Sequence, residues 1–241
     1  MSCLLYGIVR APAGASAGGA PPPPLAPGVA GAPVRLIEHR GLGAAVSAID
    51  PPDPTSGVEP LLTYAKVIEA LHVDRTVLPM RYGCLFREEA EVVELLRARG
   101  DHYAAVLREL EGCVEMGVRV LLAPPSSPCR PATCCGSGRA YLAERAARYA
   151  REEEAARAGA AVVACLRGAL GGLARRTRTE PGGGADRPVA SLDFLVERGA
   201  VESFRRAFRR IQGPASARLL LTGPWPPYSF VTSERDGDRH G

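Results

Sequence analysis

The stretch Arg218-Leu-Leu-Leu-Thr-Gly-Pro-Trp-Pro-Pro-Tyr-Ser-Phe-Val231 decides how the C-terminal part of the chain folds. Its three consecutive leucines form a short apolar run bounded by Gly223 and Pro224, which is typical of a β-strand. The three prolines fix φ at their own positions and bias the residues before them towards extended backbone. Trp225, the only tryptophan of the chain, is therefore held on a stiff segment. The stretch carries no nucleophile, acid–base pair or set of metal ligands, so it predicts a packing or contact surface.

The segment Trp225-Pro226-Pro227-Tyr228 allows two interpretations. In the first, it locks the last strand against the body of its own domain. In the second, it contacts a partner, because rigid aromatic side chains lose little entropy on binding and often anchor interfaces. The two are compatible if one face of the segment packs and the other stays open.

The bulk composition bounds the class of protein. A chain of 241 residues with 46% hydrophobic residues can bury a proper core in one or two domains. Its net charge of +4 comes from interspersed acids and bases, so no strong field for nucleic acid or anionic membrane is expected. The first residues lack the pattern of an export signal, and no run approaches the roughly 18 apolar residues of a membrane helix. We therefore expect a cytoplasmic protein whose seven cysteines are reduced.

Residues 1–123 predict a modified ferredoxin-like α+β domain, in which helices cover one face of a mainly antiparallel sheet. Residues 11–33 interrupt it as an Ala/Gly/Pro insertion that buries too little to offset its ordering entropy. Gly41 is expected to turn a hairpin, Gly100 to separate two helices, and Pro79 to place its strand at an edge or an end. The expected strands cover 3–9, 35–37, 42–49, 76–82 and 117–122, and the expected helices cover 59–73, 87–99 and 103–110.

The helix predicted over 59–73 has apolar residues at helical spacing, which indicates one buried face. These residues are Leu61, Leu62, Ala65, Ile68 and Leu71.

Residues 139–232 predict a smaller C-terminal α+β domain after a connector over 124–138, and residues 233–241 a disordered tail. The domain opens with one long helix from Arg139 to about Leu173, on the order of 50 Å long at 1.5 Å per residue. Residues 177–186 are polar and are expected to form a turn region between two strands. In the second strand, four alternate apolar residues from Ala190 to Val196 share a face.

Three patterns resemble chemical motifs, and each has a simpler structural interpretation. Gly14-Ala-Ser-Ala-Gly18 matches the hydrolase nucleophile motif in letters, but it lacks the strand before and helix after that the motif requires. Cys129, Cys134 and Cys135 do not form the paired knuckles of a zinc site, so we expect incidental loop thiols. The four histidines do not cluster, and His72 suits a helix C-terminus. We therefore predict no catalytic residue, no metal and no cofactor.

The cluster Arg205-Arg-Ala-Phe-Arg-Arg210 leaves one alternative open. Arginine interleaved with Phe204 and Phe208 can indicate single-stranded nucleic acid binding. The two phenylalanines nevertheless fall on the stripe expected to be buried, with the arginines opposite, as in any solvated amphipathic helix. Binding of nucleic acid by an α+β module built around this helix therefore stays open as an alternative function.

Four phrases together resemble the GvpL/GvpF family of gas vesicle proteins. The phrase Leu221-Thr-Gly-Pro-Trp-Pro-Pro-Tyr-Ser-Phe230 resembles its C-terminal signature. Supporting phrases stand in order along the chain at Leu4–Val9, Val77–Gly83 and Gly138–Leu142. The resemblance spans nearly the whole chain, while the 11–33 insertion and the cysteine-bearing connector depart from it.

The resemblance implies a non-enzymatic assembly or minor structural protein associated with gas vesicles in the cytoplasm. It also implies that the partners are the major gas vesicle shell protein and other gas vesicle accessory proteins, with no nucleic acid, membrane or small-molecule substrate. Seven residues of the matching phrases are expected either to contact a partner or to belong to the family signature. They are Arg81, Tyr82, Tyr141, Trp225, Pro226, Pro227 and Tyr228. For Arg81 and Tyr82, whose place beside a strand end suits either role, we favour a structural one.

Overall fold

The computed structural model describes residues 2–11, 27–49, 57–122, 138–181, 190–211 and 217–231. The chain divides into two compact units, one formed by residues 1–115 with 224–241 and the other by residues 116–223. The chain passes between the units inside two strands, β6 (Cys113–Leu122) and β9 (Ala217–Trp225). This division differs from the boundary expected over 124–138, most of which lies outside the described residues.

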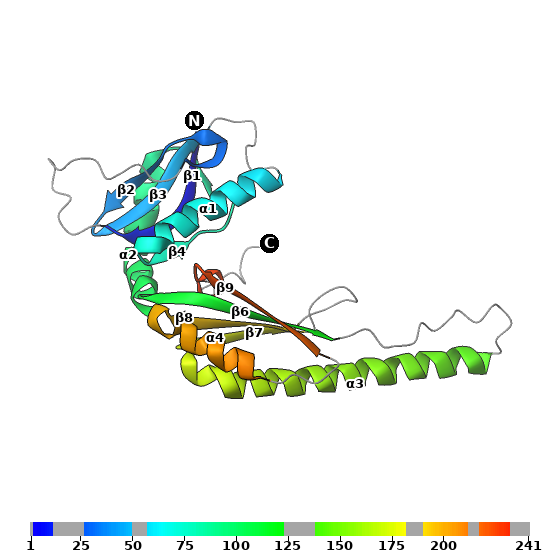
Figure 1. Ribbon diagram of the computed structural model, residues 1–241. Helices are drawn as coiled ribbons and strands as arrows, with labels where there is room; N and C mark the ends of the chain where they lie inside the picture. The colour runs from blue at the N-terminus through cyan, green and yellow to red at the C-terminus, as the bar shows by residue number, and fades with distance from the viewer. Residues whose placement is uncertain are drawn as a thin grey trace. The chain divides into compact units, whose positions relative to one another are not determined.

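The first unit is built on a sheet of order β2-β3-β1-β4, with β5 also paired to β1 (Figure 1). All four pairings are antiparallel. The short strand β4 carries Pro79 at its end and lies at the edge of this order, as expected. The strands are β1 (Ser2–Arg10), β2 (Val34–His39), β3 (Leu42–Ile49), β4 (Val77–Pro79) and β5 (Leu85–Phe86).

The hairpin between β2 and β3 turns on two residues, Arg40 with φ 47° and Gly41 with φ 78°. Two positive φ values in a two-residue turn match the twist of the flanking strands. The hairpin predicted around Gly41 is therefore confirmed, and it places an arginine at the tip of the turn.

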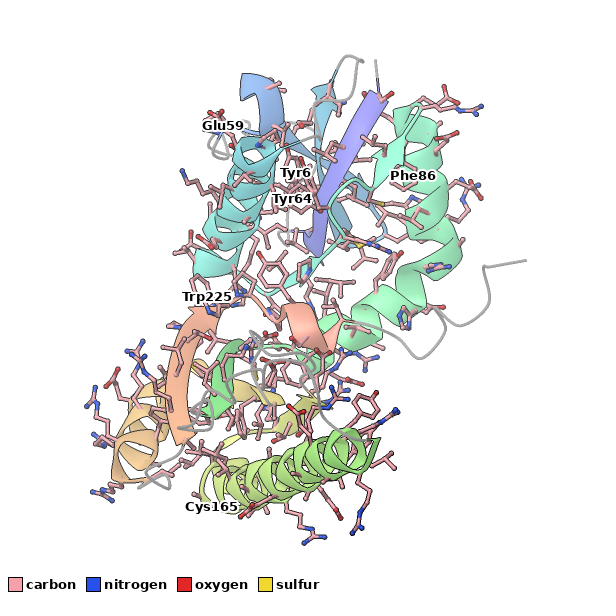
Figure 2. All side chains as sticks on the ribbon, turned by 90° about the vertical axis from the view of Figure 1, so that its right-hand side faces the viewer. Tyr6, Glu59, Tyr64, Phe86, Cys165 and Trp225 are labelled. Atoms are coloured by element: carbon pink, nitrogen blue, oxygen red, sulfur yellow. The ribbon has the colours of Figure 1, made fainter. Side chains whose placement is uncertain are left out.

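The helices α1 (Val58–Asp74) and α2 (Glu89–Glu109) cover opposite faces of this sheet (Figures 1 and 2). The expectation that helices cover one face was wrong. The reason is visible in β1, where every residue from Cys3 to Val9 is buried, so the strand lacks the alternation of a sheet with one open face.

The helix α2 runs without a break through Gly100, where the sequence predicted a separation between two helices. A glycine inside a helix costs about 1 kcal/mol relative to alanine. Burial of Val92, Leu96, Tyr103 and Leu107 along one side of α2 outweighs that cost.

Tyr6 organises the core on the α1 side of the sheet. Its ring is fully buried and stacks on Tyr64 of α1 with 4.9 Å between ring centroids. Its hydroxyl hydrogen-bonds Ser47 Oγ at 2.8 Å and accepts the backbone N–H of Val29 at 2.9 Å. The short 3-10 helix η1 (Val29–Gly31) is thereby joined to the sheet.

The second unit is built on a sheet of order β7-β8-β6-β9, with α3 and α4 on one face (Figure 1). Phe194 of β8 meets Phe204 of α4 edge to face, and both rings are fully buried. Residues 117–122, expected to complete the first sheet, belong to β6 of this one, because its pairing partners β8 and β9 come later in the chain. The elements are α3 (Gly138–Leu170), η2 (Gly171–Leu173), β7 (Arg176–Pro181), β8 (Ala190–Glu197), η3 (Arg198–Ala200) and α4 (Val201–Arg210).

The strand β7 occupies part of the region that was predicted to be a polar turn. Its residues alternate between arginine and threonine and pair with β8 from Arg176 opposite Leu195 to Pro181 opposite Ala190. Polar, charged residues and a terminal proline are common on edge strands, where they discourage pairing with another chain. Polarity here indicates a protected edge, which the sequence pattern did not distinguish from a turn.

The long helix α3 packs only with its C-terminal half. Val162, Leu166 and Leu170, spaced four residues apart, are buried, whereas every described residue from Arg139 to Arg157 is exposed. Contrary to expectation, Ala156–Leu173 is long and apolar enough, at mean hydropathy 1.2, to cross a membrane. One such stretch is weak grounds for a membrane span, because core helices meet the same criterion.

The fold is therefore α+β, with mixed helix and antiparallel sheet, as predicted. The ferredoxin-like description of the first domain stays a prediction.

Candidate functional site

The C-terminal segment exposes two aromatic side chains, one on each side of two buried prolines. Trp225 ends β9 and is 43% exposed, and Tyr228 begins the 3-10 helix η4 (Tyr228–Phe230) and is 38% exposed. Pro226 and Pro227 between them are buried. The backbone N–H of Tyr228 donates to the Pro226 carbonyl at 2.8 Å and closes the turn. The prolines therefore pack, as in the first interpretation, while the rings stay exposed, and the partner contact of the second interpretation stays a prediction.

Glu115 of β6 holds this turn in place. Its carboxylate accepts the backbone N–H of Ser229 at 2.7 Å and the Ser229 hydroxyl at 3.0 Å, and its side chain is buried. Hydrogen bonds to a carboxylate are roughly twice as strong as neutral ones. Phe230, also buried, follows directly. The two exposed rings thus stand on a fixed support.

The phenol of Tyr228 lies close enough to α1 to sense its charge. Burial, together with the carboxylates of Glu69 on α1 and of Glu115, raises the pKa of Tyr228 to about 12. The phenol is therefore neutral at physiological pH. Its hydroxyl remains a donor beside an acidic, partly apolar helix.

The helix α1 exposes a second apolar stripe beside its buried face. Leu61 and Leu62, predicted to be buried with Ile68 and Leu71, are 45% and 56% exposed, so that part of the prediction was wrong. At 100° per residue, Val58 and Leu62 share a direction that lies well away from the buried Tyr64. Val73 in the last turn is 69% exposed.

Figure 2 shows Glu59 at one end of α1 and Trp225 near the other. We call the exposed apolar side chains of this part of the first unit the α1–Trp225 surface. It consists of Val58, Leu61, Leu62, Val73, Trp225 and Tyr228. The spacing of Val58 and Leu62 could have indicated this stripe, but the sequence does not show which side of an apolar helix faces the sheet.

Tyr82 lies in the core rather than on this surface. Its ring meets Tyr64 edge to face at 5.0 Å, and Tyr64 in turn stacks on Tyr6. Arg81 is exposed, and its carbonyl accepts the N–H of Cys84 across a turn in which Gly83 has φ 85°. Tyr82 thus packs against the core, while the structural role favoured for the Arg81 side chain stays a prediction.

The hydroxyl of Tyr64 ties α1 to the strand ends. It lies 2.9 Å from the carbonyl oxygens of both Leu5 and Met80, and it can donate its single hydrogen to one of them at a time. Burial strongly raises the pKa of Tyr64. This tyrosine acts as a hydrogen-bond donor that joins α1 to the strand ends.

Tyr141 belongs to the other unit, in the first turns of α3, where it is 61% exposed. Within the described residues, Tyr141 makes no hydrogen bond and no ring contact. Trp225, Pro226, Pro227 and Tyr228 are therefore neighbours within the first unit, and Tyr141 is part of the second.

The described residues contain no cluster of three metal-ligating side chains. Gly14–Gly18, Cys129, Cys134 and Cys135 lie outside them. Burial raises the pKa of the Cys84 and Cys3 thiols, so neither is an activated nucleophile. In α4, Phe204 is buried and Arg205 pairs with Glu202 at 2.7 Å, as expected of an amphipathic surface helix.

Comparison with known proteins gives a consistent result. The model of the family described as gas vesicle synthesis protein GvpL/GvpF matches residues 2–232. Gas vesicle protein F of a Streptomyces species is 31% identical over 96% of this chain and 100% of its own, and that of Haloferax mediterranei is 28% identical over 85% and 84%. The crystal structure of GvpF from Anabaena superposes with a TM-score of 0.73 at 17% identity and covers 99% of both chains.

Proposed function

Because the chain belongs to the GvpL/GvpF family of gas vesicle synthesis proteins, we propose that it assists vesicle assembly by binding the major shell protein, with no bond made or broken. Such a role places it with gas vesicles in the cytoplasm, alongside other accessory proteins of the same assembly. It needs no cofactor, and the described residues hold no group of three His, Cys, Asp or Glu side chains that could bind a metal ion.

The observation that carries this proposal is the α1–Trp225 surface. Exposed large apolar side chains are normal when scattered singly, but several of them along one helix, with an exposed aromatic pair near its end, favour an interaction site. Trp225 and Tyr228 are the residue types that dominate binding energy at interfaces. Because Glu115 and two buried prolines hold them, little side-chain or backbone freedom would be lost on binding.

A shell subunit that is not yet assembled must keep its apolar surface from random association. We infer that the α1–Trp225 surface covers part of the shell subunit's apolar surface and releases the shell subunit during assembly. The helix α1 has a local charge of −2, because it carries three acids and one base. These are Glu59, Glu69 and Asp74, and Lys66. A shell segment with an apolar face and basic flanks would suit this surrounding charge.

Pull-down of the shell protein with the tagged chain tests the proposal. Leu62→Asp and Trp225→Ala should each weaken capture by at least about tenfold, as expected for interface anchors worth more than about 1.4 kcal/mol. Leu142→Asp is the matched control, because Leu142 is similarly exposed, at 63% against 56% for Leu62, but lies on α3. Failure of the unaltered chain to capture shell protein, together with normal vesicles in a strain that lacks it, would refute the proposal.

A further inference from the structure

The first unit contains a cavity of about 420 Å³ whose wall carries four arginines. They are Arg10 at the end of β1, Arg40 in the β2–β3 turn, and Arg97 and Arg108 on α2. None of them belongs to the α1–Trp225 surface. This cavity could not be predicted from the sequence, because its arginines come from three segments and no motif connects them.

Local structure explains why the arginines meet. Arg97 and Arg108 are eleven residues apart, which is close to three full turns, so they lie on one side of α2 with Asp101 between them. Arg10 is paired opposite Leu42, directly after the hairpin turn that carries Arg40. Gly100 faces the hairpin, and a Cβ there would lie 3.7 Å from Leu42 Cδ1, so its lack of a side chain leaves space in the cavity.

Existing partners compensate little of this charge. Arg10 lies 3.9 Å from Glu111, and Arg97 lies 3.1 Å from Glu94, but both pairs are more than half exposed. Exposed pairs of this kind contribute little and are easily exchanged for a better partner. Arg108 donates to the carbonyl of Ala104, and Arg40 forms no ion pair with any residue that the structure describes. With Asp101 as the only acid in the wall, four arginines leave an excess of three positive charges.

We propose that this cavity binds a small phosphate monoester that carries a hydroxyl group. A guanidinium group offers two parallel N–H donors that match phosphate oxygens, and several of them can surround a dianion. Asp101 would repel a second anionic group, but it can accept a hydrogen bond from a neighbouring hydroxyl. The volume lies within the range of about 300–1,000 Å³ that is usual for small-ligand sites.

This proposal does not depend on shell binding, and its test uses the full chain alone. Calorimetric titration with glycerol 3-phosphate, at constant ionic strength set with sodium chloride, should show saturable binding. Arg40→Gln and Arg108→Gln should each raise the dissociation constant at least about tenfold, which is the usual effect of losing one charged hydrogen bond. Arg209→Gln on α4, another exposed arginine, should leave it unchanged.

Asp101→Asn separates the two parts of the proposal. It should weaken binding of glycerol 3-phosphate relative to inorganic phosphate, because only the ester has a hydroxyl for the carboxylate to accept. Circular dichroism of each variant checks that these surface changes leave the fold intact. Equal affinity of the Arg40→Gln, Arg108→Gln and unaltered chains, absence of saturable binding, or preference for a glutamate-rich peptide over both phosphates would overturn the proposal.

Discussion

Replacing Glu115 by alanine removes the group that fixes the exposed aromatic pair. Its carboxylate accepts two hydrogen bonds from Ser229, at 2.7 and 3.0 Å, and each charged bond is worth roughly 1.5–3 kcal/mol in a buried setting. Water can reach the half-buried Ser229 once the carboxylate is gone, and a buried charge no longer has to be desolvated. We therefore expect a net loss of about 2 kcal/mol for the η4 turn.

Hydrogen exchange measures this loss directly. Since 1.4 kcal/mol corresponds to a factor of ten, amide protection at Ser229 and Phe230 should fall by about 30-fold if the turn opens locally. Glu115→Gln retains one acceptor and should lose less. Trp225 is the only tryptophan, so acrylamide quenching of tryptophan fluorescence reports on its indole alone. This quenching should increase in the Glu115→Ala chain.

The β2–β3 hairpin supplies the internal control, because it shares no hydrogen bond with η4. Its amides should keep their protection in the Glu115→Ala chain. Unchanged protection at Ser229 would refute the reasoning that this carboxylate holds the turn. So would an equal loss in the hairpin, which would indicate general destabilisation.

Three further predictions concern the same unit. Tyr64→Phe removes the donor shared by the Leu5 and Met80 carbonyls, and denaturant unfolding should show a loss of about 1–2 kcal/mol. Gly28→Ala would bring a Cβ within 2.4 Å of the Tyr6 hydroxyl and should cost about 1–3 kcal/mol, whereas Gly168→Ala on α3 meets open space and should stabilise the chain slightly. Because the folded pKa of Tyr228 lies above the unfolded value, its contribution to stability is complete below pH 10 and should be lost as the pH rises to about 12. Comparing tyrosinate absorbance with that of Tyr228→Phe checks the midpoint, and a midpoint near 10 would contradict the burial of the phenol.

The local elements were largely predictable because their signals are local. Gly41 marked the hairpin, Pro79 the end of an edge strand, and the alternation from Ala190 to Val196 a buried strand face. The stiffness of the Trp225–Tyr228 segment follows from proline geometry alone. These features depend on the backbone preferences of a few neighbouring residues, which the sequence displays directly.

The predictions from sequence fail where tertiary packing determines the structure. Gly100 does not interrupt α2, because Leu96 and Tyr103 on either side are buried against the sheet. Residues 117–122 pair with strands that the chain reaches only later. Leu61 and Leu62 have the spacing of core residues, yet both are exposed, because Leu62 points away from the buried face and Leu61 lies in the first turn of α1. Glu115, which is 114 residues from its partner Ser229, gave no sequence signal at all.

Fluorescence of Trp225 during titration with the shell protein tests the central claim most directly, because the chain has a single indole and it lies on the α1–Trp225 surface. We predict a saturable blue shift as the 43% exposed ring leaves water, and the loss of this shift at the same shell concentrations in Leu62→Asp but not in Leu142→Asp. Shell binding that leaves the emission of Trp225 unchanged would contradict the account.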